Sequence, residues 1–182
     1  IGLDVHIVVS DHTRPEYVTQ CLDSVKIAAD AASYPVAVHV VPGVPGHVGH
    51  ARHDGYNRGT HPYATFVDDD DYVLPEAFEV LRKSIEKQPA AIFTQELMLQ
   101  NGVLMKTARR HHLAAYRRDV LETFDFREWT VDGDLVLRTH VSKLDCIDIE
   151  KQVYVWRLHQ SRARELRRTV VEETRRAHGQ SA

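Results

Sequence analysis

Four consecutive aspartates, Asp68 to Asp71, are the side chains whose type and spacing point most directly to chemistry. They follow the run Ala64-Thr65-Phe66-Val67, which is typical of a buried strand. Carboxylates held this close repel one another, so a cation that neutralises them lowers the free energy of the cluster. Magnesium sites are built from one or two such oxygens and the phosphates of a substrate. The cluster therefore predicts a site for Mg²⁺ or Mn²⁺ and a diphosphate, with a solvated acidic turn as the alternative.

The segments before the aspartates alternate between strand and helix patterns. Strands are predicted at residues 5–9, 36–41 and 64–67, with helices at 15–32 and 51–57 between them. Thr13-Arg14-Pro15-Glu16 has the form of a capping box, which predicts Thr13 as the N-cap of the first helix. This alternation is typical of parallel strands joined by crossover helices. In such sheets ligands bind beyond the carboxyl ends of the strands, where the aspartates lie.

The second half of the chain predicts a smaller antiparallel portion. The dipeptide Asn101-Gly102, between strand patterns at residues 91–99 and 103–105, is a strong hairpin signal. The other predicted elements are helices after Pro75 and at 118–123 and 134–141, strands at 145–149 and 153–158, and an Arg-rich C-terminal helix. The predicted fold class is α/β, with a mostly parallel central sheet, helices on both faces and an antiparallel portion.

Length and composition predict one ordinary globular domain over residues 1–182. The chain has 182 residues, of which 43% are hydrophobic and 27% charged, and a formal charge of -3. No run approaches the roughly 18 apolar residues of a membrane span, and Ile1-Gly2-Leu3-Asp4 lacks the features of a secretion signal. Cys21 and Cys146 make neither a disulfide framework nor a zinc knuckle, which fits a reducing compartment. A cytoplasmic location is therefore expected.

Phe66-Val67-Asp68-Asp69-Asp70-Asp71, followed by Pro75, resembles the hydrophobic pair, D-x-D-D and proline segment of GT-A glycosyltransferases, especially those of family 2. Other segments resemble motifs of that family in the same order: Val8 to Arg14 its nucleotide-contacting strand, Ala51 to Asn57 its ARN-G helix, Tyr116 to Leu121 its RR segment, Asp132-Gly133-Asp134-Leu135 its acidic segment, and Trp156 to Ser161 its late R-x-H. The resemblance implies a single GT-A (Rossmann-like) domain. Its parts would be a nucleotide-binding half (1–71), an acceptor and catalytic half (72–161) and the Arg-rich C-terminal helix (162–182).

The resemblance also implies a metal-dependent transfer of a sugar from a nucleotide-diphospho-sugar to an acceptor hydroxyl, with inversion. A UDP-sugar is the expected donor, and the acceptor hydroxyl would belong to a glycan, a protein, a lipid-linked sugar or a modified nucleic acid. The residues implied for the nucleotide and its diphosphate are Ser10, Asp11, Thr13, Arg14, Arg52, Asp68 and Asp69. For Arg52, an ion pair with Asp54 or Asp69 is the alternative.

The implied metal ligands are Asp68, Asp70 and His159, with Mn²⁺ or Mg²⁺ as the cation. Asp132 is the implied general base, which takes the proton of the acceptor hydroxyl as its oxygen attacks. Val131 stands where the family has a glutamate before the base, and Asp134, only two positions from Asp132, is an alternative base. Capping of the following helix is another role open to Asp132.

Two other functions remain open. Asp69-x-Asp71-x-Val73 also resembles the nucleophile motif of haloacid dehalogenase-like phosphatases, although Lys143 is poorly placed for their later lysine. A non-enzymatic nucleotide or nucleic-acid binder would use the arginines from residue 157 onward, with the aspartates only structural. His111 and His112 either face the acceptor or lie in a polar loop.

Overall fold

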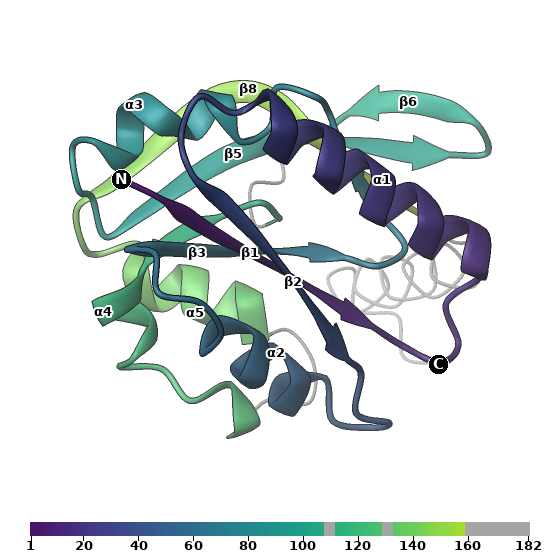
Figure 1. Cartoon of the computed structure of the whole chain (residues 1–182), viewed down its shortest axis with the longest axis horizontal. Helices are drawn as coiled ribbons and strands as arrows, with labels where there is room; N and C mark the ends of the chain where they lie inside the picture. The colour runs from purple at the N-terminus through teal and green to yellow at the C-terminus, as the bar shows by residue number, and fades with distance from the viewer. Residues whose placement is uncertain (108–111, 129–132, 159–182) are drawn as a thin grey trace, which may run out of the picture.

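One sheet runs through the protein, with the strand order β2-β1-β3-β7-β5-β8-β4 and with β6 paired to β5. The computed structural model describes residues 1–107, 112–128 and 133–158, which are coloured in Figure 1. The strands are β1 (Leu3–Val9), β2 (Val36–Pro42), β3 (Tyr63–Asp68), β4 (Tyr72–Val73), β5 (Ala91–Gln100), β6 (Val103–Lys106), β7 (Ala115–Arg117) and β8 (Cys146–Arg157). The helices are α1 (Pro15–Ala31), α2 (Val48–Tyr56), α3 (Arg82–Ile85), α4 (Arg118–Leu121) and α5 (Gly133–Val141), with 3₁₀ turns η1 (Glu79–Leu81) and η2 (Phe126–Glu128).

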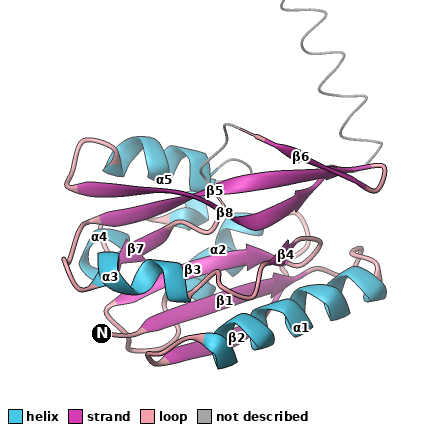
Figure 2. Ribbon diagram, turned by 90° about the horizontal axis from the view of Figure 1, so that it is seen from above, coloured by secondary structure: helices cyan, strands magenta, loops and turns pink. Residues whose placement is uncertain are grey.

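The long strands of the sheet share one direction. β1 pairs in parallel with β2 and β3, and β5 pairs in parallel with β8. The short strand β7 is antiparallel to both β3 and β5, so β3 and β5 also run the same way. β4 and β6 add antiparallel pairs, and Figure 2 shows the β5–β6 hairpin at one end of the sheet. The predicted α/β class, with a mostly parallel sheet and an antiparallel portion, is confirmed.

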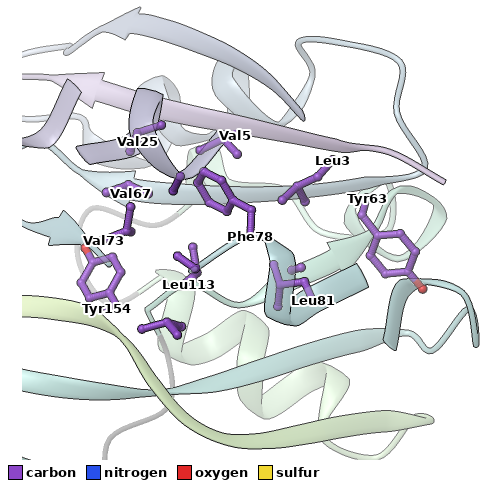
Figure 3. Packing of buried hydrophobic residues seen from close by; sticks show 14 of the residues in the cluster. Leu3, Val5, Val25, Tyr63, Val67, Val73, Phe78, Leu81, Leu113 and Tyr154 are labelled. Carbon is purple, nitrogen blue, oxygen red and sulfur yellow. The ribbon is translucent and has the colours of Figure 1, made fainter. Parts of the chain in front are cut away.

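Apolar side chains cover both faces of the sheet. On one face, Val25 of α1 and Phe78 of the segment before η1 are fully buried against β1 and β3. Figure 3 shows Phe78 in the middle of this cluster. The cluster on the other face, below α2, α4 and α5, includes Tyr56, Leu121, Leu137 and Val141. Helix α1 therefore lies on one side of β1 and β3, and helices α2, α4 and α5 lie on the other, as Figure 1 shows.

Several local predictions differ from the structure. The N-cap of α1 is Arg14, with no side-chain capping bond, and Thr13 Oγ1 lies 2.9 Å from Ser10 Oγ instead, so the predicted capping box is wrong. The two strands predicted after residue 145 form one strand, β8, whose register against β5 shifts beside Gln95. The helix predicted after Pro75 is reduced to η1 and α3. β4 and β7 were not predicted, because two or three residues carry no periodic pattern.

Other predictions concern the cysteines and the possibility of a membrane span. Cys21 and Cys146 are both free thiols. No helix in the described ranges combines the length and the apolar character needed to cross a bilayer. The predicted Arg-rich helix at residues 162–182 lies outside the described part of the chain.

A buried carboxylate, Asp4, ties the start of β1 to the RR segment. Asp4 is 2% exposed, and its Oδ2 accepts hydrogen bonds from Arg118 Nη2 (2.6 Å) and the His61 backbone N–H (2.8 Å). Asp4 Oδ1 lies 2.9 Å from His39 Nε2. Arg118 also donates to the backbone oxygens of His61 and Tyr56. The second arginine of the RR segment therefore supports the fold at the end of the sheet opposite the aspartates.

Arg118→Ala is expected to lower the free energy of unfolding by about 3–5 kcal/mol, because it removes the guanidinium that pairs with the buried carboxylate of Asp4. Arg117→Ala is the matched control, since Arg117 pairs with the exposed Asp119 and such surface pairs contribute about 0–1 kcal/mol. Urea unfolding followed by circular dichroism measures both variants. Equal losses for the two neighbouring arginines would contradict the role given to Arg118.

Candidate functional site

The four aspartates form a tight turn at the carboxyl end of β3, called here the aspartate turn. Asp68 is the last residue of β3, and the Asp71 backbone N–H donates to the Asp68 backbone oxygen at 3.1 Å. The turn brings the side chains at its first and fourth positions close together. β1 runs parallel to β3, so the loop that follows β1 reaches the same edge of the sheet.

The second aspartate fastens the turn to the loop after β1. Asp69 Oδ2 accepts hydrogen bonds from the Ser10 backbone N–H at 2.8 Å and from the Ser10 hydroxyl at 3.0 Å. Ser10 Oγ in turn lies 2.9 Å from Thr13 Oγ1. The structure thus brings together three of the residues predicted to contact the nucleotide. Two others, Asp11 and Arg14, are exposed on the same loop.

Asp68 is paired with an arginine from α2. Arg52 Nη2 donates to Asp68 Oδ1 at 2.8 Å, and the guanidinium carbon lies 3.7 Å from the centre of the Phe66 ring. Arg52 is 8% exposed, whereas the Asp68 side chain is 31% exposed and still reaches solvent. Arg52 is therefore in an ion pair, but with Asp68, which is neither of the two expected partners, Asp54 and Asp69.

The side chain of Asp71, the fourth residue of the aspartate turn, is buried and joins the turn to β8. Its Oδ2 accepts a hydrogen bond from the Tyr154 hydroxyl at 2.7 Å, and its Oδ1 accepts one from the Arg157 backbone N–H at 2.6 Å. Burial raises the pKa of Asp71 well above its ordinary value, and the negative charges of Asp70 and Asp68 raise it further. A positive group beside the turn would therefore stabilise the ionised form of Asp71.

The side chain of Arg157, the last residue of β8, is hydrogen-bonded to the backbone of the aspartate turn. Its Nε donates to the Asp70 backbone oxygen at 2.7 Å, and its Nη2 donates to the Gln20 side chain at 2.7 Å. The guanidinium carbon lies 4.0 Å from the centre of the Tyr17 ring. Arg157 is the arginine of the late R-x-H segment, so this part of the motif supports the shape of the aspartate turn.

His112 lies against the same carboxylates. Its Nε2 is 3.6 Å from Asp68 Oδ2, and its Nδ1 is 2.9 Å from Oε2 of Glu96, a fully buried residue of β5. Burial lowers the pKa of His112, but the hydrogen bond to Glu96 and the charges of Glu96, Asp68 and Asp71 outweigh it and raise the pKa to about 9. His112 lies in a turn, as the polar-loop alternative expects, but its side chain is only 7% exposed and lies against carboxylates.

Asp68, Asp71 and His112 form the group that could hold a metal ion. Each offers one ligand atom, and these atoms lie within 4.8 Å of one another. No other such group of His, Cys, Asp or Glu side chains occurs in the part of the chain that the structure describes. Two carboxylate oxygens and one imidazole nitrogen suit Mn²⁺ and, less well, Mg²⁺. The chemistry of these side chains therefore fits the predicted divalent cation.

The predicted ligands overlap this group only in Asp68. The Asp70 side chain is half-buried and does not belong to the group. His159 and the predicted base Asp132 lie outside the described residues, as does the side chain of Asp134.

The sequence places Asp71 in the acidic cluster and leaves His112 the option of facing the acceptor, but it predicts neither as a metal ligand and does not single out Glu96. A four-residue turn brings its first and fourth side chains together, and this rule would have pointed to Asp71. For His112 the sequence offered only a pair of histidines in a loop. For Glu96 it gave no signal beyond an acidic residue within a strand pattern.

Solved structures with the same architecture include S. aureus TarS. TarS 1-349 matches with a TM-score of 0.66 and 13% identity, over 86% of this chain and 60% of that chain. TarS 1-349 in complex with UDP-GlcNAc matches with a TM-score of 0.64 and 13% identity, over 88% and 59%. The bifunctional IspDF from Campylobacter jejuni matches with a TM-score of 0.53 and 8% identity, over 84% and 50%. At these identities the likeness shows the fold alone, and this chain spans about three fifths of TarS 1-349.

Comparison with curated proteins gave no match. Residues 7–137, however, match the family described as glycosyl transferase family 2. The matched range covers more than half of the 182 residues and contains the loop after β1, Arg52, the aspartate turn and His112. The resemblance noted from the sequence motifs is confirmed, and the chain belongs to glycosyl transferase family 2.

Proposed function

We propose that this protein transfers a sugar from a nucleoside-diphosphate sugar to an acceptor hydroxyl, with Mn²⁺ or Mg²⁺ bound at the aspartate turn. The observation that carries the proposal is the group of Asp68, Asp71 and His112 at the carboxyl end of β3. A mainly acidic group at that edge of a parallel sheet suits a cation together with a diphosphate. The shared fold with TarS, which has been solved in complex with UDP-GlcNAc, supports a UDP-sugar as the donor.

On the donor side, we assign Ser10, Thr13 and Asp69 to the nucleoside, because their hydrogen bonds give the loop after β1 a fixed shape beside the turn. Asp11 and Arg14, exposed on that loop, are assigned to the same ligand. Arg52 is proposed to bind the diphosphate, since its ion pair with Asp68 already directs the guanidinium toward the turn. A divalent cation bound there would supply Lewis-acid stabilisation of the departing diphosphate.

On the acceptor side, a hydroxyl must lose its proton as its oxygen attacks the anomeric carbon. We propose that the carboxylate of Asp132 accepts this proton as the general base, with Asp134 as the alternative. We also propose a single displacement that inverts the anomeric centre. The acceptor hydroxyl would belong to a glycan, a protein, a lipid-linked sugar or a modified nucleic acid. Membership of glycosyl transferase family 2 favours this reaction over the phosphatase alternative.

A UDP-sugar is expected to stabilise the protein against unfolding only when a divalent cation is present. At a ligand concentration of 100 times Kd, binding to the native state adds about 2.7 kcal/mol to the free energy of unfolding. Thermal unfolding with UDP-, GDP- and TDP-sugars, each with Mn²⁺ or with EDTA, measures this effect, and release of the nucleoside diphosphate measures turnover. If a UDP-sugar stabilised the protein equally with EDTA and with Mn²⁺, the proposed need for a divalent cation would be wrong. Stabilisation by nucleic acid but by no sugar nucleotide would instead favour the non-enzymatic binder.

A further inference from the structure

We propose that Glu96 is a positioning residue that holds the His112 ring so that Nε2 becomes a nitrogen ligand of the cation at the aspartate turn. The inference rests on the proposed function, because it needs a cation beside Asp68 and Asp71. Glu96 lies on β5 and is 0% exposed. A buried carboxylate is unfavourable unless it is paired and hydrogen-bonded, so the contacts of Glu96 indicate its role.

Both carboxylate oxygens of Glu96 are directed at His112. Oε1 accepts a hydrogen bond from the His112 backbone N–H at 2.9 Å, and Oε2 lies 2.9 Å from Nδ1 of the ring. Thr94, two residues earlier on the same face of β5, donates from Oγ1 to the Leu113 backbone oxygen at 3.4 Å. β5 therefore holds the backbone of residues 112 and 113, and Glu96 also determines which ring nitrogen of His112 faces the strand.

Two aromatic rings on β8 fix the plane of the His112 ring. The Tyr154 ring lies 4.9 Å away at an interplanar angle of 6°, and the Trp156 ring lies 6.3 Å away at 19°. With the plane set by these rings and Nδ1 set by Glu96, Nε2 faces the turn, 3.6 Å from Asp68 Oδ2. The Tyr154 hydroxyl also donates to Asp71, so one side chain orients both a carboxylate and the imidazole.

The resulting arrangement is the one that metal-bound histidines use. A neutral ring that carries its proton on Nδ1, donated to Glu96, offers the lone pair of Nε2. Metal-bound histidines commonly donate their other N–H to a carboxylate, which fixes the ring and strengthens the ligand. The 3.6 Å between Nε2 and Asp68 Oδ2 exceeds a hydrogen bond, yet suits two ligands that share a cation about 2.1 Å from each. A proton on Nε2 would leave to solvent as the nitrogen–metal bond forms.

The structural alternative is a buried ion pair that only holds the loop in place, so the test must observe the nitrogen itself. Pulsed EPR of Mn²⁺ bound to the full chain with UDP reports hyperfine coupling to a directly bound ¹⁴N. The wild type is expected to show this coupling, and His112→Gln is expected to lose it while Mn²⁺ still binds through the carboxylates. Glu96→Gln, which keeps the size of the side chain, is expected to weaken Mn²⁺ affinity by about 10–100-fold and to reduce the coupling.

Two further variants separate positioning from a loss of fold. Glu96→Asp keeps the charge on a shorter side chain and is expected to give an affinity between those of the wild type and Glu96→Gln. Glu86→Gln removes the same charge from an exposed glutamate that pairs with Arg82, and is expected to keep wild-type affinity and coupling. The unsubstituted protein provides a readout that does not depend on how well any variant folds.

The outcomes that would overturn this inference are distinct from those that would overturn the proposed function, except where no cation binds. If the wild type binds Mn²⁺ with UDP but shows no nitrogen coupling, or if His112→Gln keeps the coupling, the role of His112 is wrong while the cation-dependent function stands. If Glu96→Gln folds and matches the wild type in affinity and coupling, Glu96 does not position the ring. If no Mn²⁺ binds with UDP, this inference and the cation of the proposed function fail together.

Discussion

Asp132→Asn is expected to fold and to bind the donor, but to transfer sugar about 10²–10⁴ times more slowly than the wild type. The loss would follow because an amide cannot take the proton of the acceptor hydroxyl as its oxygen attacks. Capping of the helix that follows is the other role open to Asp132. Asn caps a helix about as well as Asp, and the substitution therefore separates the two roles.

Rates measured in single turnover with a saturating UDP-sugar test the base directly, because product release then does not mask the chemical step. Asp134→Asn is the control, since it removes the other acidic group of the same segment. A slow Asp132→Asn enzyme beside a normal Asp134→Asn enzyme would support the assignment. The reverse pattern would make Asp134 the base, and wild-type rates for both would remove the acidic segment from the reaction.

Asp68→Asn is expected to lower kcat/KM by about 10²–10³-fold. The variant lacks the carboxylate proposed to hold the cation that stabilises the departing diphosphate. Asp68 is the one residue common to the predicted ligands and to the group that the structure brings together. Asp30→Asn is the matched control, since it removes a carboxylate of α1 that pairs with Lys26 at the surface. Calorimetric titration with Mn²⁺ checks the cause of the loss, and unchanged Mn²⁺ affinity in Asp68→Asn would contradict it.

The same titration applied to Asp70→Asn and Asp71→Asn identifies the second carboxylate ligand. A larger loss of Mn²⁺ affinity in Asp70→Asn would favour the ligand proposed from the sequence motif. A larger loss in Asp71→Asn would favour the group observed in the structure, provided that urea unfolding shows the variant to be folded. That control is needed because Asp71 also accepts hydrogen bonds from Tyr154 and Arg157.

Much of the fold could be predicted because its signals are local. The run Ala64-Thr65-Phe66-Val67 predicts the strand before the aspartates, because a short apolar run indicates a buried strand without information about its distant partners. The dipeptide Asn101-Gly102 predicts the hairpin for the same reason, and both residues have the positive φ that its tight turn requires. The prediction of a capping box was wrong because the Thr13 hydroxyl is hydrogen-bonded to Ser10, outside the helix. No local pattern in the sequence indicates that contact.

The site was predictable only in part, because several of its contacts join residues far apart in the chain. The aspartates could be predicted as part of a site because four of them are consecutive and follow a predicted strand. The approach of Glu96 to His112 depends on the pairing of β5 and on the rings that β8 supplies, and the register of that pairing shifts beside Gln95. One sequence contains no signal for such a shift, so the buried partner of His112 could not be inferred from it.

The dependence of the aspartate turn on β8 also sets the order in which the site can assemble. Asp71 is 83 residues from Tyr154 and 86 residues from Arg157, whereas Asp69 is 59 residues from Ser10. Closing such long loops costs entropy that only the finished sheet offsets. On a ribosome, Asp71 would emerge long before β8, the strand that supplies its hydrogen-bond donors. A nascent chain that stops before β8 would therefore lack the donors that hold Asp71, and ligand binding would appear only in the last stage of folding.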